Sequence, residues 1–370
     1  MNECMSIQDI ESDIFNKKSK KKQIYGRFKM NRGEDRYIYI PIDNKRIVAK
    51  SFELYSTLSR IRKLYVNLLV KLIYFINPKF IYEDILYLDL NENIKLILDN
   101  VGPWKYVSLY TGDGYKYVLQ VMDKDAKILG YMKIYNSKDA IKEMVKEING
   151  SKKALELGFD NIPNIVYEDR EKGIFVQDTG LNITPFVLNL NIIDFLNRSL
   201  QKTWKRELLR NSVWFKHIEY LGKYYNDKEG SELFTKTLRM LLENKEIEYI
   251  YTCFSHGDFT LKNMKSKNNS IYIYDWEFAD IRPIYYDIFF FFVILGMENK
   301  LSSEKIINSI FNNKYIEKYE LDNDISISLR KPMFIIFLCE LIYFHIGDDI
   351  DNKIHNRNSL KALNILKTLI

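Results

Sequence analysis

The chain has 370 residues, of which 46% are hydrophobic and 28% are charged. This balance excludes an intrinsically disordered protein, and the length leaves room for two or three domains or lobes. The longest apolar run, residues 288–297, is only about half as long as a membrane-spanning helix, so we expect a buried helix there.

The positive charge of the chain is concentrated near its beginning. Residues 1–80 contain 17 Lys and Arg against 8 Asp and Glu, whereas the remainder contains 38 against 41. Any attraction to an anionic membrane or glycan should therefore come from residues 1–80. Because no RNA-recognition or helix-turn-helix signature accompanies this charge, we predict no nucleic-acid partner.

Two further features bear on the cellular compartment. Cys4, Cys253 and Cys339 lie far apart and lack metal-ligand spacing, a usage that suits a reducing cytoplasm. The first residues also lack the continuous apolar stretch of a signal peptide. We expect a cytoplasmic protein, and a peripheral contact with the inner face of the membrane stays open through the basic segment.

Residues 1–95 predict an N-terminal extension. Its first 22 residues are polar and end in "KKSKKK", which indicates a mobile arm. Residues 36–55 hold two alternating runs about a polar "DNK", a pattern typical of a hairpin. Residues 54–76 then show apolar positions at helical spacing with Lys and Arg among them. Such a helix either lies on a membrane surface or packs on its own protein with its bases in water.

The texture changes to short strands in residues 96–180. The strand-like runs are "WKYVSLY" (104–110), "YKYVLQVMD" (115–123), "AKILGYMKIY" (126–135), "IPNIVYED" (162–169) and "GIFVQDTG" (173–180). A helical segment rich in Lys and Glu, residues 137–157, interrupts them. These runs predict a small antiparallel sheet with one inserted helix. Residues 181–370 read as mainly helical, apart from strands at 249–255 and 270–276.

The strongest functional signal is the stretch "HGDFTLKN", followed by "YDWEF" after a short interval. It contains His256, Asp258 and Asn263, and then Asp275 at the end of a strand-like run. This order is the catalytic-loop pattern of protein-kinase-like phosphotransferases. The sequence resembles the aminoglycoside phosphotransferase and choline kinase branch, in which the loop reads "HGD....N" and "DWE" replaces "DFG". The resemblance covers residues 96–300 well and does not explain the first 95.

The resemblance implies a bilobal, protein-kinase-like α+β fold. We expect an N-terminal extension at 1–95, an antiparallel-sheet N-lobe with one helix at 96–180, and a mainly helical C-lobe with the catalytic loop at 181–370.

Phosphoryl transfer needs a carboxylate near the attacking hydroxyl and hard oxygen ligands for Mg²⁺. Asp258 is the candidate for the first task, and the resemblance implies Asn263 and Asp275 for the second. His256 is expected to brace the loop by hydrogen bonds. Asp287, which precedes "IFFFF", matches the residue that starts a buried helix and anchors the loop in this family.

The same resemblance implies a strand-borne Lys for the nucleotide phosphates and a helix-borne Glu that orients it. Lys133 in "GYMKIY" is the candidate Lys, and Glu147 is the preferred partner, with Glu143 left open. The turn that contains Gly112 and Gly114 is a candidate for folding over the phosphates.

The stretch "FVQDTGL" is expected to connect the two lobes. Backbone groups near Gln177 and Asp178 would then receive the adenine. The implied cofactors are ATP, with GTP left open, and Mg²⁺.

The sequence therefore predicts a kinase that phosphorylates a hydroxyl of a small molecule. A sugar or cell-envelope saccharide is preferred, because the basic N-terminal segment suits an anionic glycan or lipid-linked acceptor. The alternatives are an aminoglycoside-type antibiotic, which would suit the acids of residues 319–326 and 346–352, and a catalytically inactive binding module. A protein kinase is disfavoured because "DWE" replaces "DFG" and no "APE" follows. The oligomeric state stays open.

Overall fold

The chain forms two compact units. The computed structural model describes residues 14–16, 22–31, 34–42, 45–52, 83–111, 116–159, 161–179, 183–225, 228–267, 270–347 and 357–370. Unit 1 comprises Met1–Leu155, Phe159–Pro185 and Lys265–Glu277, and unit 2 comprises Glu156–Gly158, Phe186–Met264 and Phe278–Ile370. Unit 1 thus takes in the expected segments 1–95 and 96–180, except for residues 156–158, and two short pieces of the third, residues 181–185 and 265–277.

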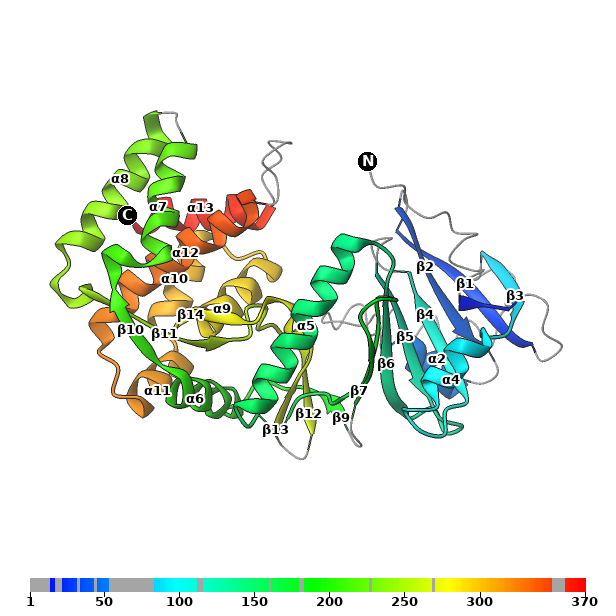
Figure 1. Ribbon diagram of the computed structural model, residues 1–370. Coiled ribbons are helices and arrows are strands. Elements are labelled where there is room, and N and C mark those ends of the chain that lie inside the picture. Colours follow the sequence, from blue (N-terminus) through cyan, green and yellow to red (C-terminus); the bar gives the residue numbers. More distant parts are fainter. Residues whose placement is uncertain are drawn as a thin grey trace. The chain divides into compact units, whose positions relative to one another are not determined.

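Unit 1 is built on an antiparallel sheet, which has eight strands among the described residues in the order β3-β1-β2-β4-β5-β6-β8-β7 (Figure 1). The strands are β1 Gln23–Asn31, β2 Glu34–Pro41, β3 Asp84–Leu88, β4 Tyr106–Tyr110, β5 Lys116–Met122, β6 Ile128–Tyr135, β7 Ile165–Asp169 and β8 Ile174–Asp178. Helix α5, Lys138–Glu156, follows β6 and packs its apolar side, including Met144 and Ile148, against Tyr135 and Phe175. The predicted antiparallel sheet with one inserted helix is confirmed.

The opposite face of the sheet carries a core that joins the N-terminal strands to the rest of unit 1. Met132 and Lys133 are neighbours in β6 and therefore point to opposite faces. Met132 belongs to this core, together with Tyr25 of β1, Tyr39 of β2 and Leu119 of β5. Helix α4, Glu92–Leu98, covers it with Ile94 and Leu98. The strands of residues 1–95 are thus part of the sheet.

One expectation for the N-terminal segment is wrong, and a second fails at those of its residues that the structure describes. The second half of the expected hairpin at 36–55 is helix α2, Lys45–Ser51, because the adjacent Ile47 and Val48 are both buried and the Ser51 hydroxyl donates to the Ile47 carbonyl, one helical turn back. Strand β2 pairs instead with β1. Within the expected mobile arm, Phe15 is buried and forms a bridge with Leu90. The expected basic helix at 54–76 lies outside the described residues.

This arrangement predicts the effect of shortening the chain. A protein that begins at Ile94 lacks β1, β2 and β3, so the apolar side chains of Leu109 and Leu119 lose their cover and β4 becomes an open sheet edge. Each buried side chain removed, such as Tyr39, contributed about 1.5–3 kcal/mol. We expect aggregation, measured as the soluble fraction and by size-exclusion chromatography. A chain that begins at Ile14 is the control, and a monodisperse, cooperatively unfolding protein that begins at Ile94 would contradict the prediction.

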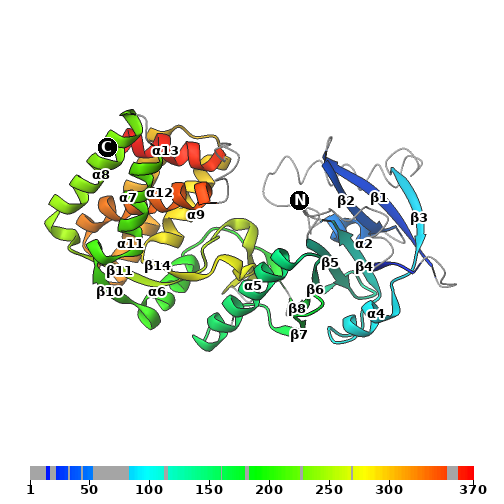
Figure 2. The same ribbon diagram turned by 45° about the horizontal axis from the view of Figure 1, so that its top comes forward.

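Unit 2 is mainly helical, as predicted. Its helices are α6 Asn191–Thr203, α7 Val213–Tyr224, α8 Lys228–Glu243, α9 Tyr286–Glu298, α10 Ser303–Phe311, α11 Lys314–Asp322, α12 Arg330–Gly347 and α13 Arg357–Leu369. Helix α12 packs against α7 and α13, and the three lie together in both views (Figures 1 and 2). The apolar run at 288–297 is a buried stretch of α9, and within the described ranges no helix is long and apolar enough to cross a bilayer.

Two smaller sheets hold the segments around the motif. In unit 2, β11 (Tyr249–Ser255) lies between β10 (Lys205–Leu208) and β14 (Asp280–Pro283). In unit 1, β12 (Met264–Lys267) lies between β9 (Ile183–Pro185) and β13 (Ser270–Ile273). The chain therefore leaves unit 2 after Met264 and re-enters it at Phe278.

Candidate functional site

The motif residues fall into two groups, one in each unit. In unit 2, β11 ends at Ser255 and leads into His256, which is buried. Asp287, in the first turn of α9, accepts hydrogen bonds from two successive amides, that of His256 at 2.7 Å and that of Gly257 at 3.0 Å. The His256 Nδ1 in turn accepts from the Asp258 amide at 3.2 Å. Three consecutive amides are thus fixed by buried side chains.

Burial makes the Asp287 carboxylate costly, and the bonds to it offset that cost. Burial raises the pKa of Asp287, while the hydrogen bonds from the amides of His256 and Gly257 act in the opposite direction. The charge of Arg282 acts in the same stabilising sense.

Glycine is the residue type that fits position 257 without strain. Its φ is +84°, in the left-handed region, and a Cβ there would lie 2.1 Å from the carbonyl oxygen of Phe278. Both facts favour glycine. The close approach also fixes where the backbone re-enters unit 2 after the second half of the motif.

Asp258 is held by Asn263 from the same loop. The Asn263 Nδ2 donates to Asp258 Oδ2 at 2.8 Å and to the Asp258 carbonyl at 3.0 Å. Asn263 ends a short 3₁₀ turn, Leu261–Asn263, which brings the two side chains together across five residues. The carboxylate of Asp258 is therefore oriented by a neutral donor.

The unit 1 group is centred on Lys133. Its Nζ forms a short ion pair with Glu147 of α5 and lies 2.5 Å from Asp275 Oδ1. Glu147 is fully buried and also accepts from the Tyr135 hydroxyl at 2.9 Å. Glu143, the alternative partner, instead pairs with Lys146 on the exposed side of α5. Of the two acids left open by the sequence, the one that contacts Lys133 is Glu147.

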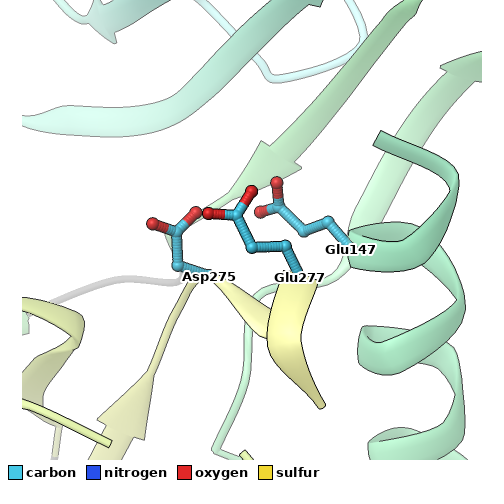
Figure 3. A group of neighbouring side chains, drawn as sticks. All are labelled: Glu147, Asp275 and Glu277. Carbon is cyan, nitrogen blue, oxygen red and sulfur yellow. The ribbon is translucent and has the colours of Figure 1, made fainter. Parts of the chain in front are cut away.

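The backbone of Asp275 adopts an uncommon conformation. Its φ is +65°, a left-handed conformation that is uncommon outside glycine and that Asp and Asn tolerate best. It follows β13 and precedes the 3₁₀ turn Trp276–Phe278. The turn directs Glu277 toward the same cluster, and Figure 3 shows the carboxylates of Glu147, Asp275 and Glu277 gathered in one place.

Two members of this cluster, Lys116 and Glu277, were not predicted from the sequence as site residues. The Lys116 Nζ lies 3.4 Å from the carboxylate of Glu277, the last residue of "DWE". Burial, and next the charge of Asp275, raise the pKa of Glu277 to about 7, and Lys116 opposes that rise. The position of Lys116 just after the "TGDG" turn was a signal, but a lone Lys in a strand usually points to solvent.

The cluster has the oxygen donors that Mg²⁺ prefers. One oxygen of each of the three carboxylates lies within 4.8 Å of the others. Carboxylate oxygens are hard ligands, so this donor set fits a divalent cation. The predicted ligand Asp275 belongs to this cluster, whereas the predicted ligand Asn263 lies in unit 2.

The expected adenine region lies at the end of β8, where only some of the described polar groups have hydrogen-bond partners. The amides of Asp178 and Thr179 donate to the carbonyls of Asn164 and Leu129, and the Asp178 carboxylate accepts from the Asn164 amide. The Gln177 Nε2 is buried without a hydrogen-bond partner in the described part of the chain. Gly112 and Gly114 lie outside the described residues.

Neither a known family model nor a curated protein sequence matches the chain. Solved structures do resemble it. Choline kinase LicA from Streptococcus pneumoniae is 12% identical with a TM-score of 0.48, and the match covers 75% of this chain and 98% of LicA. The aminoglycoside phosphotransferase APH(2")-IIa with streptomycin and ATP is 11% identical with a TM-score of 0.48, and the match covers 76% of this chain and 97% of that one. For the GDP complex of aminoglycoside 2'-phosphotransferase-IIIa the corresponding values are 12%, 0.47, 75% and 97%.

At identities of 11–12% and TM-scores below 0.5, the likeness is a distant one and concerns the fold alone. The α+β class predicted from the sequence is confirmed by the antiparallel sheet with α5 in unit 1 and by the helices of unit 2. The solved structures named above are a choline kinase and two aminoglycoside phosphotransferases.

Proposed function

We propose that the chain is a phosphotransferase that uses ATP and Mg²⁺ to phosphorylate a hydroxyl group of a small molecule. The observation that supports this most is the contact of Lys133 with both Glu147 and Asp275. A strand-borne Lys held by a helix-borne Glu beside a metal-binding Asp is the arrangement that protein-kinase-like enzymes use for phosphoryl transfer. GTP is a second candidate donor.

In unit 1, Lys133 would contact the phosphates and Glu147 would hold its ammonium group in place. Asp275 would offer the principal anionic ligand to the metal, and Asn263 of unit 2 a neutral one. When bound, Mg²⁺ neutralises the charge of the transferred phosphoryl group. The buried amide of Gln177 is a candidate for contacting the base of the nucleotide.

In unit 2, Asp258 would accept the proton of the acceptor hydroxyl and orient that hydroxyl for attack. Asn263 keeps one of its oxygens engaged, so the carboxylate has a defined direction. His256 and Asp287 hold the loop backbone through the hydrogen bonds that they accept from its amides. This division leaves Asp258 as the catalytic carboxylate and the other two as its support.

A sugar or cell-envelope saccharide is the preferred acceptor. The acids of residues 319–326 had suggested a polycationic aminoglycoside, but Glu320 forms a buried ion pair with Arg330 and Asp322 pairs with Lys318 at 2.8 Å. The acidic charge of that stretch is therefore largely neutralised within unit 2. Contact of an anionic glycan or membrane with residues 1–80 remains part of this proposal.

A catalytically inactive binding module is the competing proposal. Such modules commonly lose the base, the metal ligands or the Lys, and here Lys133, Asp258, Asn263 and Asp275 are all present. The pairing of Lys133 with Glu147 further favours activity.

The test is a measurement of ADP formation by the purified protein with ATP and Mg²⁺ against panels of sugars, choline-like amines and aminoglycosides. The Asp258→Asn protein gives the background. We expect acceptor-dependent ADP formation with a member of the sugar panel. Nucleotide binding without turnover on any panel would favour the inactive module, and the lack of nucleotide binding would refute both.

A further inference from the structure

Lys116 lies on the same face of the unit 1 sheet as Lys133. Strands β5 and β6 are antiparallel neighbours, with Lys116 opposite Tyr135 and Val118 opposite Lys133. Because side chains two residues apart in a strand share a face, both lysines point toward α5 and Glu147. The chain thus places two ammonium groups, from adjacent strands, at one cluster of carboxylates.

Lys116 is bound to that cluster by several weak contacts. Its Nζ lies 3.4 Å from Glu277, 3.7 Å from Asp275 Oδ1 and 3.9 Å from Glu147, and it sits 5.4 Å from the centre of the Tyr135 ring. Its side chain is 19% exposed. The three carboxylates lie around one ammonium group, so Lys116 serves as a counter-ion to all of them.

Both lysines share one oxygen. Asp275 Oδ1 lies 2.5 Å from the Lys133 Nζ and 3.7 Å from the Lys116 Nζ. A carboxylate oxygen that turns to a divalent cation gives up its ammonium partners, because like charges repel at such distances. A released ammonium group favours a new anionic partner, because Lys133 is buried and the Lys116 side chain is only 19% exposed.

We propose that Lys116 is a second phosphate-binding lysine, which holds Glu277 and Asp275 in the nucleotide-free protein and turns to the nucleotide phosphates when those carboxylates take up the metal. This inference rests on the proposed function. It differs from a purely structural role, in which Lys116 only neutralises Glu277 and never contacts the nucleotide.

The test compares nucleotide affinity in Lys116→Met, Lys133→Met and wild-type proteins, by titration of a fluorescent ATP analogue with EDTA and then with Mg²⁺. Lys142→Met is the matched control, since Lys142 lies on the exposed side of α5 and pairs with Asp139. With Mg²⁺ we expect Lys116→Met to weaken nucleotide binding at least ~10-fold, as the loss of a charged hydrogen bond to phosphate does. With EDTA the effect should be smaller, because Lys116 then stays with the carboxylates of Asp275 and Glu277. Lys142→Met should leave nucleotide binding unchanged.

The double variant Lys116→Met/Glu277→Gln separates the two roles. It removes the unpaired carboxylate that Lys116→Met leaves behind, so it also serves if the single variant does not fold. A double variant that still binds nucleotide at least ~10-fold more weakly than Glu277→Gln alone supports direct phosphate contact. Affinity equal to that of Glu277→Gln would mean that Lys116 acts only as a counter-ion, and would overturn the inference.

A second measurement uses the metal alone. Removal of a competing ammonium group should let Mn²⁺ bind the nucleotide-free Lys116→Met protein more tightly than wild type, as read by electron paramagnetic resonance of free Mn²⁺. Weaker Mn²⁺ binding would contradict the exchange of partners. If the wild-type protein binds no nucleotide at all, the proposed function itself fails; if it binds nucleotide and Lys116→Met matches it within about twofold, only the role of Lys116 fails.

Discussion

Replacing Asp258 by Asn should lower kcat at least ~100-fold while nucleotide affinity stays near that of wild type. The change removes the carboxylate that we propose accepts the proton, and it keeps the size of the side chain. The loop should survive, because His256, Gly257 and Asp258 are held through their amides by Asp287 and the His256 ring. The bond from Asn263 can also be kept, since the new amide can present its oxygen to the Asn263 Nδ2. Steady-state kinetics and nucleotide titration together check the result.

Asp324→Asn is the matched control for this experiment. Asp324 is an exposed residue of unit 2 with a φ of +53°, a backbone conformation that Asn adopts readily. It should therefore change neither kcat nor stability. An Asp258→Asn protein with near wild-type turnover would remove Asp258 from the catalytic role, whereas a loss of nucleotide affinity along with kcat would point to disruption of the loop.

The contact between the two side chains of the proposed catalytic loop is local, so the motif alone already placed them near each other. Asp258 and Asn263 are five residues apart and bond each other within the loop. Lys133 was predicted because the resemblance implies a Lys on the third strand-like run of this region, and "GYMKIY" contains one. Its partner Glu147 was only preferred over Glu143, because both lie on a charged helix and the choice depends on which side of α5 faces the sheet.

The parts that could not be read from the sequence depend on contacts between distant residues. Lys116 contacts Glu277, which lies 161 residues further along the chain, and no local sequence pattern predicts that pairing. Helix α2 was mistaken for a strand because a short apolar run such as "IVA" is compatible with either structure, and the joint burial of Ile47 and Val48 distinguishes the two. Strand β1, "QIYGRFKMN", went unrecognised because its partners β2 and β3 are needed to bury Tyr25.

Replacing Asp275 by Asn should abolish the metal-dependent reaction. Asp275 is the anionic ligand that also contacts Lys133, so its loss removes the strongest oxygen ligand from the proposed Mg²⁺ site. We expect kcat to fall at least ~100-fold, since the metal's charge stabilisation is worth several kcal/mol. Asn263→Ala should have a smaller effect, because a neutral amide oxygen holds a dication less strongly.

The choice of Asn over Ala decides whether this experiment is interpretable. At a φ of +65° an Ala side chain would strain the backbone, so Asp275→Ala confounds a lost ligand with a distorted turn before Trp276. Asn tolerates that backbone and keeps the shape, so a loss in Asp275→Asn reports the charge. Activity and Mn²⁺ binding are titrated against metal concentration in both variants, with thermal unfolding as the check on folding. Turnover that stays low at excess Mg²⁺ agrees with direct ligation, and full recovery at modest Mg²⁺ would show that Asp275 does not hold the catalytic metal.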